Sequence, residues 1–396
     1  MAGAGLRRRI GPGLLTAYGV GVMLGAGIYV LVGAVAGAAG IWAPLSFLLA
    51  GLVAAPSALS YAELSTRYPE AAGEAAYVEA AFNRRWLMLA VGLAVALAGA
   101  ISAGAVLVGG AGYLGVLIDM PGWLAVLVLG IPTIIIALIG VLESLRFAAL
   151  LTAIEVLGLV LVIWAGGMAT DLSPDWIAAP PPVWAGVALG ATLAFFAFIG
   201  FEDIVNMAEE VRNPSRDLPI AIIASLLITT VLYGLVAWAA LRAVPVAALA
   251  ASNQPLALVW ESATGRSAGI LSLIAVVAAL NGVLGLMIMA TRVLFGLGRR
   301  GGVLAVFHAA HPRFGTPVLA TLLVGAGIII AALTLPLAAL AELTSMILLV
   351  VFALINASLI VLRARGGTKA GFQVWGIVPW FGLVGSIAAF VAALVQ

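Results

Sequence analysis

The sequence contains no cysteine, which excludes a disulfide framework and any thiolate-based metal or redox chemistry. Charged side chains are scarce as well: Asp, Glu, Lys and Arg make up 9% of the 396 residues, against about a quarter in soluble domains. The two histidines, His308 and His311, have no metal-ligating residues beside them in the sequence. We therefore expect no metal and no cofactor, and we exclude the usual soluble fold classes.

Apolar residues take the place of the missing charges and make up 64% of the chain. A helix needs about 20 apolar residues to cross the hydrocarbon of a bilayer. Eleven stretches of about this length are present, near residues 12–38, 42–64, 86–117, 121–141, 147–168, 183–210, 219–242, 267–298, 316–334, 337–362 and 373–395. The sequence therefore predicts an all-α integral membrane protein with about 11 transmembrane helices, a single domain over residues 1–396 embedded in the lipid bilayer.

Positive charges are divided unevenly between the predicted loops. With a cytoplasmic N-terminus, all but Arg242 and Arg266 of the 18 Lys and Arg fall in inner loops. Cytoplasmic loops carry such an excess because cations resist translocation. The pattern predicts a multi-pass protein of the cytoplasmic membrane with its N-terminus inside. Nothing indicates nucleic acid as a partner, since no basic patch with interleaved aromatics is present.

The first stretch carries four glycines in nine residues, Gly19, Gly21, Gly25 and Gly27. Gly25 and Gly27 can adopt dihedrals that free amide N–H groups and expose a half-helix N-terminus, which suits a carboxylate. The alternative is that these glycines only let helices pack closely, as small residues often do in membranes.

The sixth stretch favours the first of these two interpretations. It has Gly200 in mid-span, with Phe198 and Ile199 before it and the acids Glu202 and Asp203 directly after. Breaks in corresponding spans of two five-helix halves are the sequence sign of a secondary transporter's binding site. The carbonyl groups freed at the second break suit an ammonium group.

Several motifs of the chain carry a resemblance to a known family. They are Gly25-Ala26-Gly27-Ile28, Ser60 to Leu64, Tyr68 to Glu74, the sixth-span segment, Arg292 to Phe295 and His311 to Pro317. With these motifs the chain resembles bacterial amino acid permeases of the amino acid–polyamine–organocation (APC) superfamily. The resemblance implies a five-plus-five inverted repeat (LeuT-type) with broken helices 1 and 6. Helices 1–5 would cover about 12–168, helices 6–10 about 183–362, and an extra helix about 373–395.

The resemblance also implies how the substrate is held. Its carboxylate would lie on the backbone amides around Ala26, Gly27 and Ile28. Its amino group would meet carbonyl groups near Val22 and Met23 and those of Ala197, Phe198 and Ile199. Ile199 and Phe201 would face the substrate side chain. No fixed charge lies near this pocket in the sequence apart from Glu202 and Asp203, which favours a neutral amino acid.

Two polar residues within the membrane are candidates for ion or proton coupling. Glu155 stands in the fifth stretch, where several relatives carry a lysine. A carboxyl group there is costly to ionise, so it is either a proton or cation carrier or a permanently protonated hydrogen-bonding group. Asn281, in the eighth stretch, either bonds to another helix or contacts the ion and substrate region.

The function predicted is secondary active transport of amino acids, with proton coupling or exchange both open. An amine, polyamine or cationic amino acid transporter, and a non-transporting amino acid sensor, remain alternatives. An enzyme is not expected, because no phosphate-cradling loop or metal cluster is present. A channel is disfavoured because intramembrane charges are too few to line a polar pore.

Overall fold

The computed structural model describes residues 8, 10–70, 73–139, 145–300, 302–309, 316–366 and 370–395. Within these ranges the chain is helical, apart from loops and one isolated bridge between Ile10 and Val211. Parts of two motifs noted above, Ala71-Ala72 and His311 to Gly315, lie outside the described residues.

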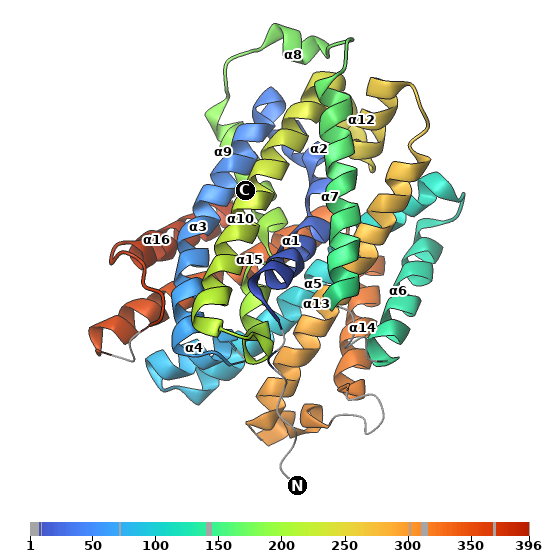
Figure 1. Cartoon of the computed structure of the whole chain (residues 1–396). Helices are drawn as coiled ribbons and strands as arrows, with labels where there is room; N and C mark the ends of the chain where they lie inside the picture. Colours follow the sequence, from blue (N-terminus) through green and yellow to red (C-terminus); the bar gives the residue numbers. More distant parts are fainter. Residues whose placement is uncertain are drawn as a thin grey trace.

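The helices follow one another in the predicted order (Figure 1). The first half contains α1 (Pro12–Ala26), α2 (Ile28–Ala39), η1 (Gly40–Trp42), α3 (Ala43–Arg67), α4 (Gly73–Phe82), α5 (Arg85–Leu117), α6 (Gly122–Ile139) and α7 (Leu145–Gly167). The second contains α8 (Pro174–Ala178), α9 (Trp184–Phe195), η2 (Phe196–Phe198), η3 (Glu202–Glu210), α10 (Pro214–Ala243), α11 (Val246–Ala251), α12 (Pro255–Thr264), α13 (Gly269–Arg299), η4 (Gly302–His308), α14 (Val318–Thr334) and α15 (Leu337–Ala364), followed by α16 (Val378–Val395).

The lengths of these helices confirm the membrane prediction. In the described part of the chain, seven helical segments are long and apolar enough to cross a membrane. Shorter apolar helices, α1, α6, α14 and α16, account for the remaining expected stretches. The extra helix begins at Val378, a few residues later than predicted. Both predicted interruptions are present, one between α1 and α2 and the other between η2 and η3.

Helix α1 lies inside the bundle, packed against α7, α10 and α13 (Figure 1). Close packing depends on glycine here, because a Cβ on Gly25 would lie 2.8 Å from the Cα of Gly282 on α13. Gly25 is therefore a packing residue within an intact helix. The first break is at Gly27 alone, which corrects the expectation that Gly25 also takes part in it.

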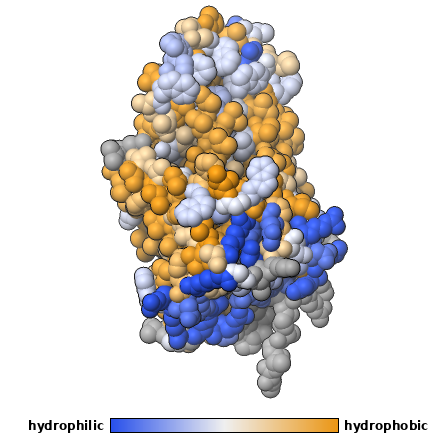
Figure 2. Space-filling model, turned by 90° about the vertical axis from the view of Figure 1, so that its left-hand side faces the viewer, coloured by the Kyte–Doolittle hydropathy of each residue, from blue (hydrophilic) through white to orange (hydrophobic). Residues whose placement is uncertain are grey.

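The outer surface has the character that a lipid environment requires. Figure 2 shows a broad apolar surface, with hydrophilic residues gathered at one end of the molecule. A charged network lies where α4, α5 and α13 meet. Arg85 donates to the carbonyl of Arg300 at 3.0 Å, and Arg300 forms ion pairs with Glu70 and Glu79. Such a band of charge at one end, next to an apolar belt, fits a polytopic membrane protein.

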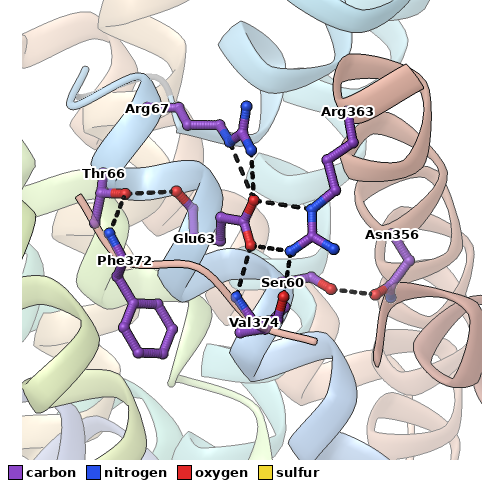
Figure 3. Close-up of polar contacts among 8 residues, drawn as sticks. All are labelled: Ser60, Glu63, Thr66, Arg67, Asn356, Arg363, Phe372 and Val374. Carbon is purple, nitrogen blue, oxygen red and sulfur yellow. Dashed lines mark hydrogen bonds and ion pairs between the residues drawn. The ribbon is translucent and has the colours of Figure 1, made fainter. Parts of the chain in front are cut away.

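A second polar network joins α3, α15 and the segment that leads into α16 (Figure 3). Glu63 near the end of α3 is fully buried and pairs with Arg67 at 2.6 Å and with Arg363 of α15. Its Oε2 atom also accepts the backbone N–H of Val374 at 2.9 Å. One carboxylate thus holds three parts of the chain together.

The same interface continues toward the middle of the bundle. Asn356 of α15 donates to the hydroxyl of Ser57 at 2.9 Å and accepts from Ser60 at 2.7 Å. The Ser60 contact appears beside the Glu63 network in Figure 3. A Cβ on Gly382 of α16 would overlap the Asn356 side chain. Polar bonds and a glycine contact therefore fix the register of α3, α15 and α16.

We predict that Glu63→Gln lowers the free energy of unfolding by about 3 kcal/mol, because it leaves two arginines beside a buried, uncharged amide. The matched control is Glu79→Gln, which removes a partly exposed partner of Arg300 and should cost less than about 1 kcal/mol. Thermal unfolding in detergent measures both. Equal losses for the two variants would show that the Glu63 network contributes nothing special.

Candidate functional site

The first break is made by a single residue between two helices. Gly27 ends α1 and begins α2 with φ −104° and ψ −61°. Its carbonyl accepts the N–H of Leu31 at 2.8 Å, so helical hydrogen bonding starts again there. The first N–H groups of a helix have no partner within it. The amides at the start of α2, from Ile28 onward, are therefore positioned to bind an anionic group.

The second break is more open in its backbone. Ile199 is extended, with φ −62° and ψ 130°, and Gly200 has φ +128°, a region that residues with a side chain rarely adopt. The N–H of Gly200 donates to the carboxylate of Glu202 at 2.9 Å. The side chain of Glu202 thus points back to the break and satisfies the freed N–H of Gly200. The 3-10 helix η3 begins at this residue.

The two breaks lie in direct contact. A Cβ on Gly27 would overlap Ala197 of the second break. A Cβ on Gly200 would lie 2.9 Å from Val22 and 3.1 Å from Met23, in the part of α1 that leads to the first break. Glycine is therefore required at both positions for close approach. The sequence-predicted residues from the two halves of the chain come together in space.

Tyr233 of α10 joins the two breaks. Its hydroxyl lies 2.8 Å from the carbonyl of Met23 and 2.9 Å from that of Ala197. A phenol has one proton to donate, so the two carbonyls share it. These two carbonyls are among those predicted to hold a substrate amino group. The site therefore presents converging acceptors, which suit an ammonium group with its several donors.

Aromatic rings enclose this region. The ring of Phe198 packs edge-on against Tyr233 at 5.2 Å between centroids. Phe201 lies 5.3 Å from Phe352 and 5.8 Å from Tyr61, measured the same way. All of these side chains are buried. A ligand at the breaks would meet apolar walls, and it reaches them only if neighbouring helices move.

The candidate coupling residues lie together on a different side of α1. Asn281 of α13 donates to Glu155 Oε1 of α7 at 2.8 Å. Glu155 is fully buried, and its Oε2 has no hydrogen-bond partner among the described residues. Gly21 of α1 faces this pair, since a Cβ there would lie 3.3 Å from the Asn281 amide and overlap Thr152. Three helices therefore meet at one carboxyl group.

A metal centre has no support in the described part of the chain. No group of three His, Cys, Asp or Glu side chains is placed there to hold a metal ion. The remaining predicted site residues, Ala26, Ile28 and Ile199, lie at or beside the breaks. Sequence reasoning missed Tyr233, Phe352 and Tyr61. A tyrosine inside an apolar span was the available signal for Tyr233.

Comparison with known proteins agrees with this architecture. A family model described as amino acid permease matches residues 14–396. The branched-chain amino acid permease BcaP of Bacillus subtilis is 32% identical over 345 residues, covering 81% of this chain and 73% of that protein. The methylthioribose transporter of the same organism is 32% identical over 357 residues, covering 83% and 76%. The chloroplastic cationic amino acid transporter 9 of Arabidopsis thaliana is 34% identical over 305 residues, covering 70% and 53%.

We predict that Tyr233→Phe loosens both breaks, because it removes the hydroxyl that their carbonyls share. A hydrogen bond contributes about 1 kcal/mol, so amide hydrogen exchange in residues 22–28 and 197–202 should become about fivefold faster. Ser102→Ala on α5 is the control, since its buried hydroxyl has no partner among the described residues. Unchanged exchange at both breaks in Tyr233→Phe would rule out the joining role.

Proposed function

This chain belongs to the amino acid permease family of the APC superfamily, and on that basis we propose that it moves a neutral amino acid across the cytoplasmic membrane by alternating access. The observation that carries the proposal is the direct contact between the two broken helices, Gly27 against Ala197 and Gly200 against Val22. Irregular backbone inside a membrane is stable only where it is buried in protein or lines a site.

The substrate backbone is the part that the breaks recognise. Its carboxylate binds the amides of Ala26, Gly27 and Ile28 at the positive end of α2. Its ammonium group donates to the carbonyls of Met23 and Ala197, so the Tyr233 hydroxyl must lose its hydrogen bond to one or both of them. Binding therefore exchanges a bond between the two breaks for bonds through the substrate, which links occupancy to the movement of the helices.

A neutral side chain is favoured by what surrounds the breaks. Phe201, Phe352 and Tyr61 form an apolar wall, and the nearest acid, Glu202, is already bonded to the N–H of Gly200. A branched-chain amino acid permease among the relatives supports the same class. The relatives also include a cationic amino acid transporter, and a cationic substrate would need Glu202 to turn toward it.

The proposal also covers the orientation of the chain in the membrane and the coupling of transport to protons. The N-terminus is cytoplasmic, because the cations lie mostly in the loops on that side of the membrane. Protons drive or accompany transport through Glu155. A charge change at Glu155 acts on α1 and α13 at once, because Asn281 and Gly21 both adjoin it.

We predict that proteoliposomes take up labelled neutral, apolar amino acids in preference to cationic ones. Gly27→Val should reduce this uptake at least about tenfold, because its side chain drives Ala197 away and a loss of about 1.4 kcal/mol in binding already costs tenfold. The control is Gly13→Val on the same helix, where a Cβ meets nothing within 4 Å.

Three results would contradict the proposal. Uptake by Gly27→Val at the parent rate would show that the breaks do not form the substrate site. Preference for arginine or lysine would favour the cationic alternative. Specific binding of amino acids without any uptake would identify a sensor.

We predict that Glu155→Gln keeps the fold but flattens the pH dependence of uptake. The amide retains the shape and the bond to Asn281 and cannot titrate. Uptake is measured with and without an imposed pH gradient, and Glu342→Gln, an exposed acid at the start of α15, is the control. Equal rates and an equal response to the gradient in Glu155→Gln and the parent would show that Glu155 is structural.

A further inference from the structure

Three carboxyl groups lie buried directly beyond the second break, toward the end of the molecule that carries α4. They are Glu74 of α4 and Glu202 and Asp203 of η3, each at most 2% exposed. Their charges act on one another, since Asp203 lies within the electrostatic reach of both Glu202 and Glu74. No ion pair joins any of the three to a cation among the described residues. We call this group the inner carboxyl cluster.

Uncharged polar side chains around the inner carboxyl cluster also lack partners. Eight of the twelve buried side-chain atoms without a hydrogen bond in the described chain belong to the cluster or its neighbours. The neighbours are the hydroxyls of Tyr18, Tyr61 and Tyr77 and the amide of Asn206. Tyr61 is within the electrostatic reach of all three acids, and Tyr18 within that of Asp203 and Glu202. They come from α1, α3, α4 and η3, and they converge on the acids.

This concentration of unsatisfied groups calls for a ligand. A buried polar atom without a partner costs about 1–3 kcal/mol, and an unpaired buried charge costs far more. Eight such atoms in one place exceed what a packed interior tolerates. A positive charge within the cluster would stabilise the carboxylates and align the hydroxyl and amide dipoles.

The geometry selects a proton over a metal ion. The three acids do not form a group that is able to hold a metal among the described residues. A proton needs no converging ligand shell, because it resides on one oxygen at a time and neighbouring hydroxyls share it. We propose that the inner carboxyl cluster binds an exchangeable proton on the cytoplasmic side of the second break, as a site separate from Glu155.

The electrostatics of Glu74 agree with such a site. The pKa of Glu74 is raised to about 8, mainly by burial. Its own backbone N–H lowers the pKa, the charge of Glu202 raises it, and the adjacent amide of Asn206 has a smaller lowering effect. Tyr61 from α3, Tyr77 from α4 and Tyr18 from α1 face the same cluster. Arg292, whose charge acts on Tyr18, is paired with Glu210 at 3.0 Å.

The cluster is coupled mechanically to the break. Glu202 accepts the N–H of Gly200, and the ring of Tyr61 packs against both Phe201 and Tyr77. The far end of η3 is tied to the start of the first span, because Ile10 donates to the carbonyl of Glu210 at 3.0 Å and Arg212 donates to that of Ile10 at 2.9 Å. Release of the proton adds negative charge beside Gly200, which biases the break toward another conformation.

An infrared titration of the purified protein in liposomes, with no amino acid added, tests the site directly. The parent should show a protonated-carboxyl band that disappears between about pH 7 and about pH 9. In a Glu155→Gln background, which removes the other buried carboxyl proposed to exchange a proton, Glu74→Gln and Asp203→Asn should each lose most of this change. Glu342→Gln, an exposed acid, should retain it.

Thermal stability gives a second readout with a defined sign. The pKa of Glu74 in the folded protein lies above the ordinary value of 4.5 for a glutamate, so between these two values the folded protein keeps a proton that the unfolded chain has lost. Its contribution to stability is complete below about pH 4.5 and disappears as the pH rises through about 8. The unfolding temperature of the parent should therefore fall between about pH 5 and about pH 8, and Glu74→Gln should show a smaller fall.

Two outcomes overturn the inference. One is an infrared titration of Glu74→Gln and Asp203→Asn in the Glu155→Gln background that matches Glu155→Gln alone. The other is a band that responds to sodium or potassium in place of choline at fixed pH, which identifies a metal cation as the ligand. The inference adds to the proposed transport function, yet the titration is independent of uptake. A protein that transports amino acids without the band refutes only the cluster, and a titrating protein without uptake refutes only the transport proposal.

Discussion

The constraint on which the whole structure depends is that every backbone N–H and C=O inside a membrane needs a partner within the protein. A broken helix violates this rule unless other groups replace the lost bonds. Here the replacements are specific. Glu202 takes the N–H of Gly200, and Tyr233 takes the carbonyls of Met23 and Ala197. The breaks are stabilised by an acid of the second break and by a tyrosine of α10 that bonds to both broken spans. A substrate that offers the same bonds can replace some of them.

The rest of the bundle holds these two breaks in position. Helix α10 supplies Tyr233. Gly282 of α13 packs closely against Gly25 of α1, and this contact positions α1 in the bundle. The Glu63 network fastens α3 to α15 and to the segment before α16. Buried ion pairs are costly to assemble and costly to break, so this network acts as a fixed joint. Movement is therefore expected in the glycine-bearing segments and not along this interface.

The sequence was sufficient for the features that depend on local composition. Apolar length predicted the spans, and glycine at positions 27 and 200 predicted both interruptions. Gly200 has φ +128°, which residues with a side chain rarely adopt, and Gly27 leaves room for Ala197. Gly25 was misread, since a glycine that frees the backbone and a glycine that packs against Gly282 look the same in sequence.

The features that the sequence could not reveal depend on distant partners. Tyr233 lies about two hundred residues from Met23 along the chain, and Glu63 about three hundred from Arg363. The local sequence marks Tyr233 as a polar group inside an apolar span, but it does not identify the partners of Tyr233 or of Glu63. Glu155 was identified as unusual by its position alone, while its bond to Asn281 emerged only in three dimensions.

The central claim, that the two breaks form one amino acid site reached in turn from both sides, is tested most directly by thiol labelling. The natural chain has no cysteine, so Ile199→Cys provides a single reporter at the second break. A membrane-impermeant thiol reagent should label this cysteine from either face of the membrane, and the transported amino acid should slow both reactions. Labelling that saturating amino acid leaves unchanged, or that occurs from one face only under all conditions, would show that the two breaks do not form such a site.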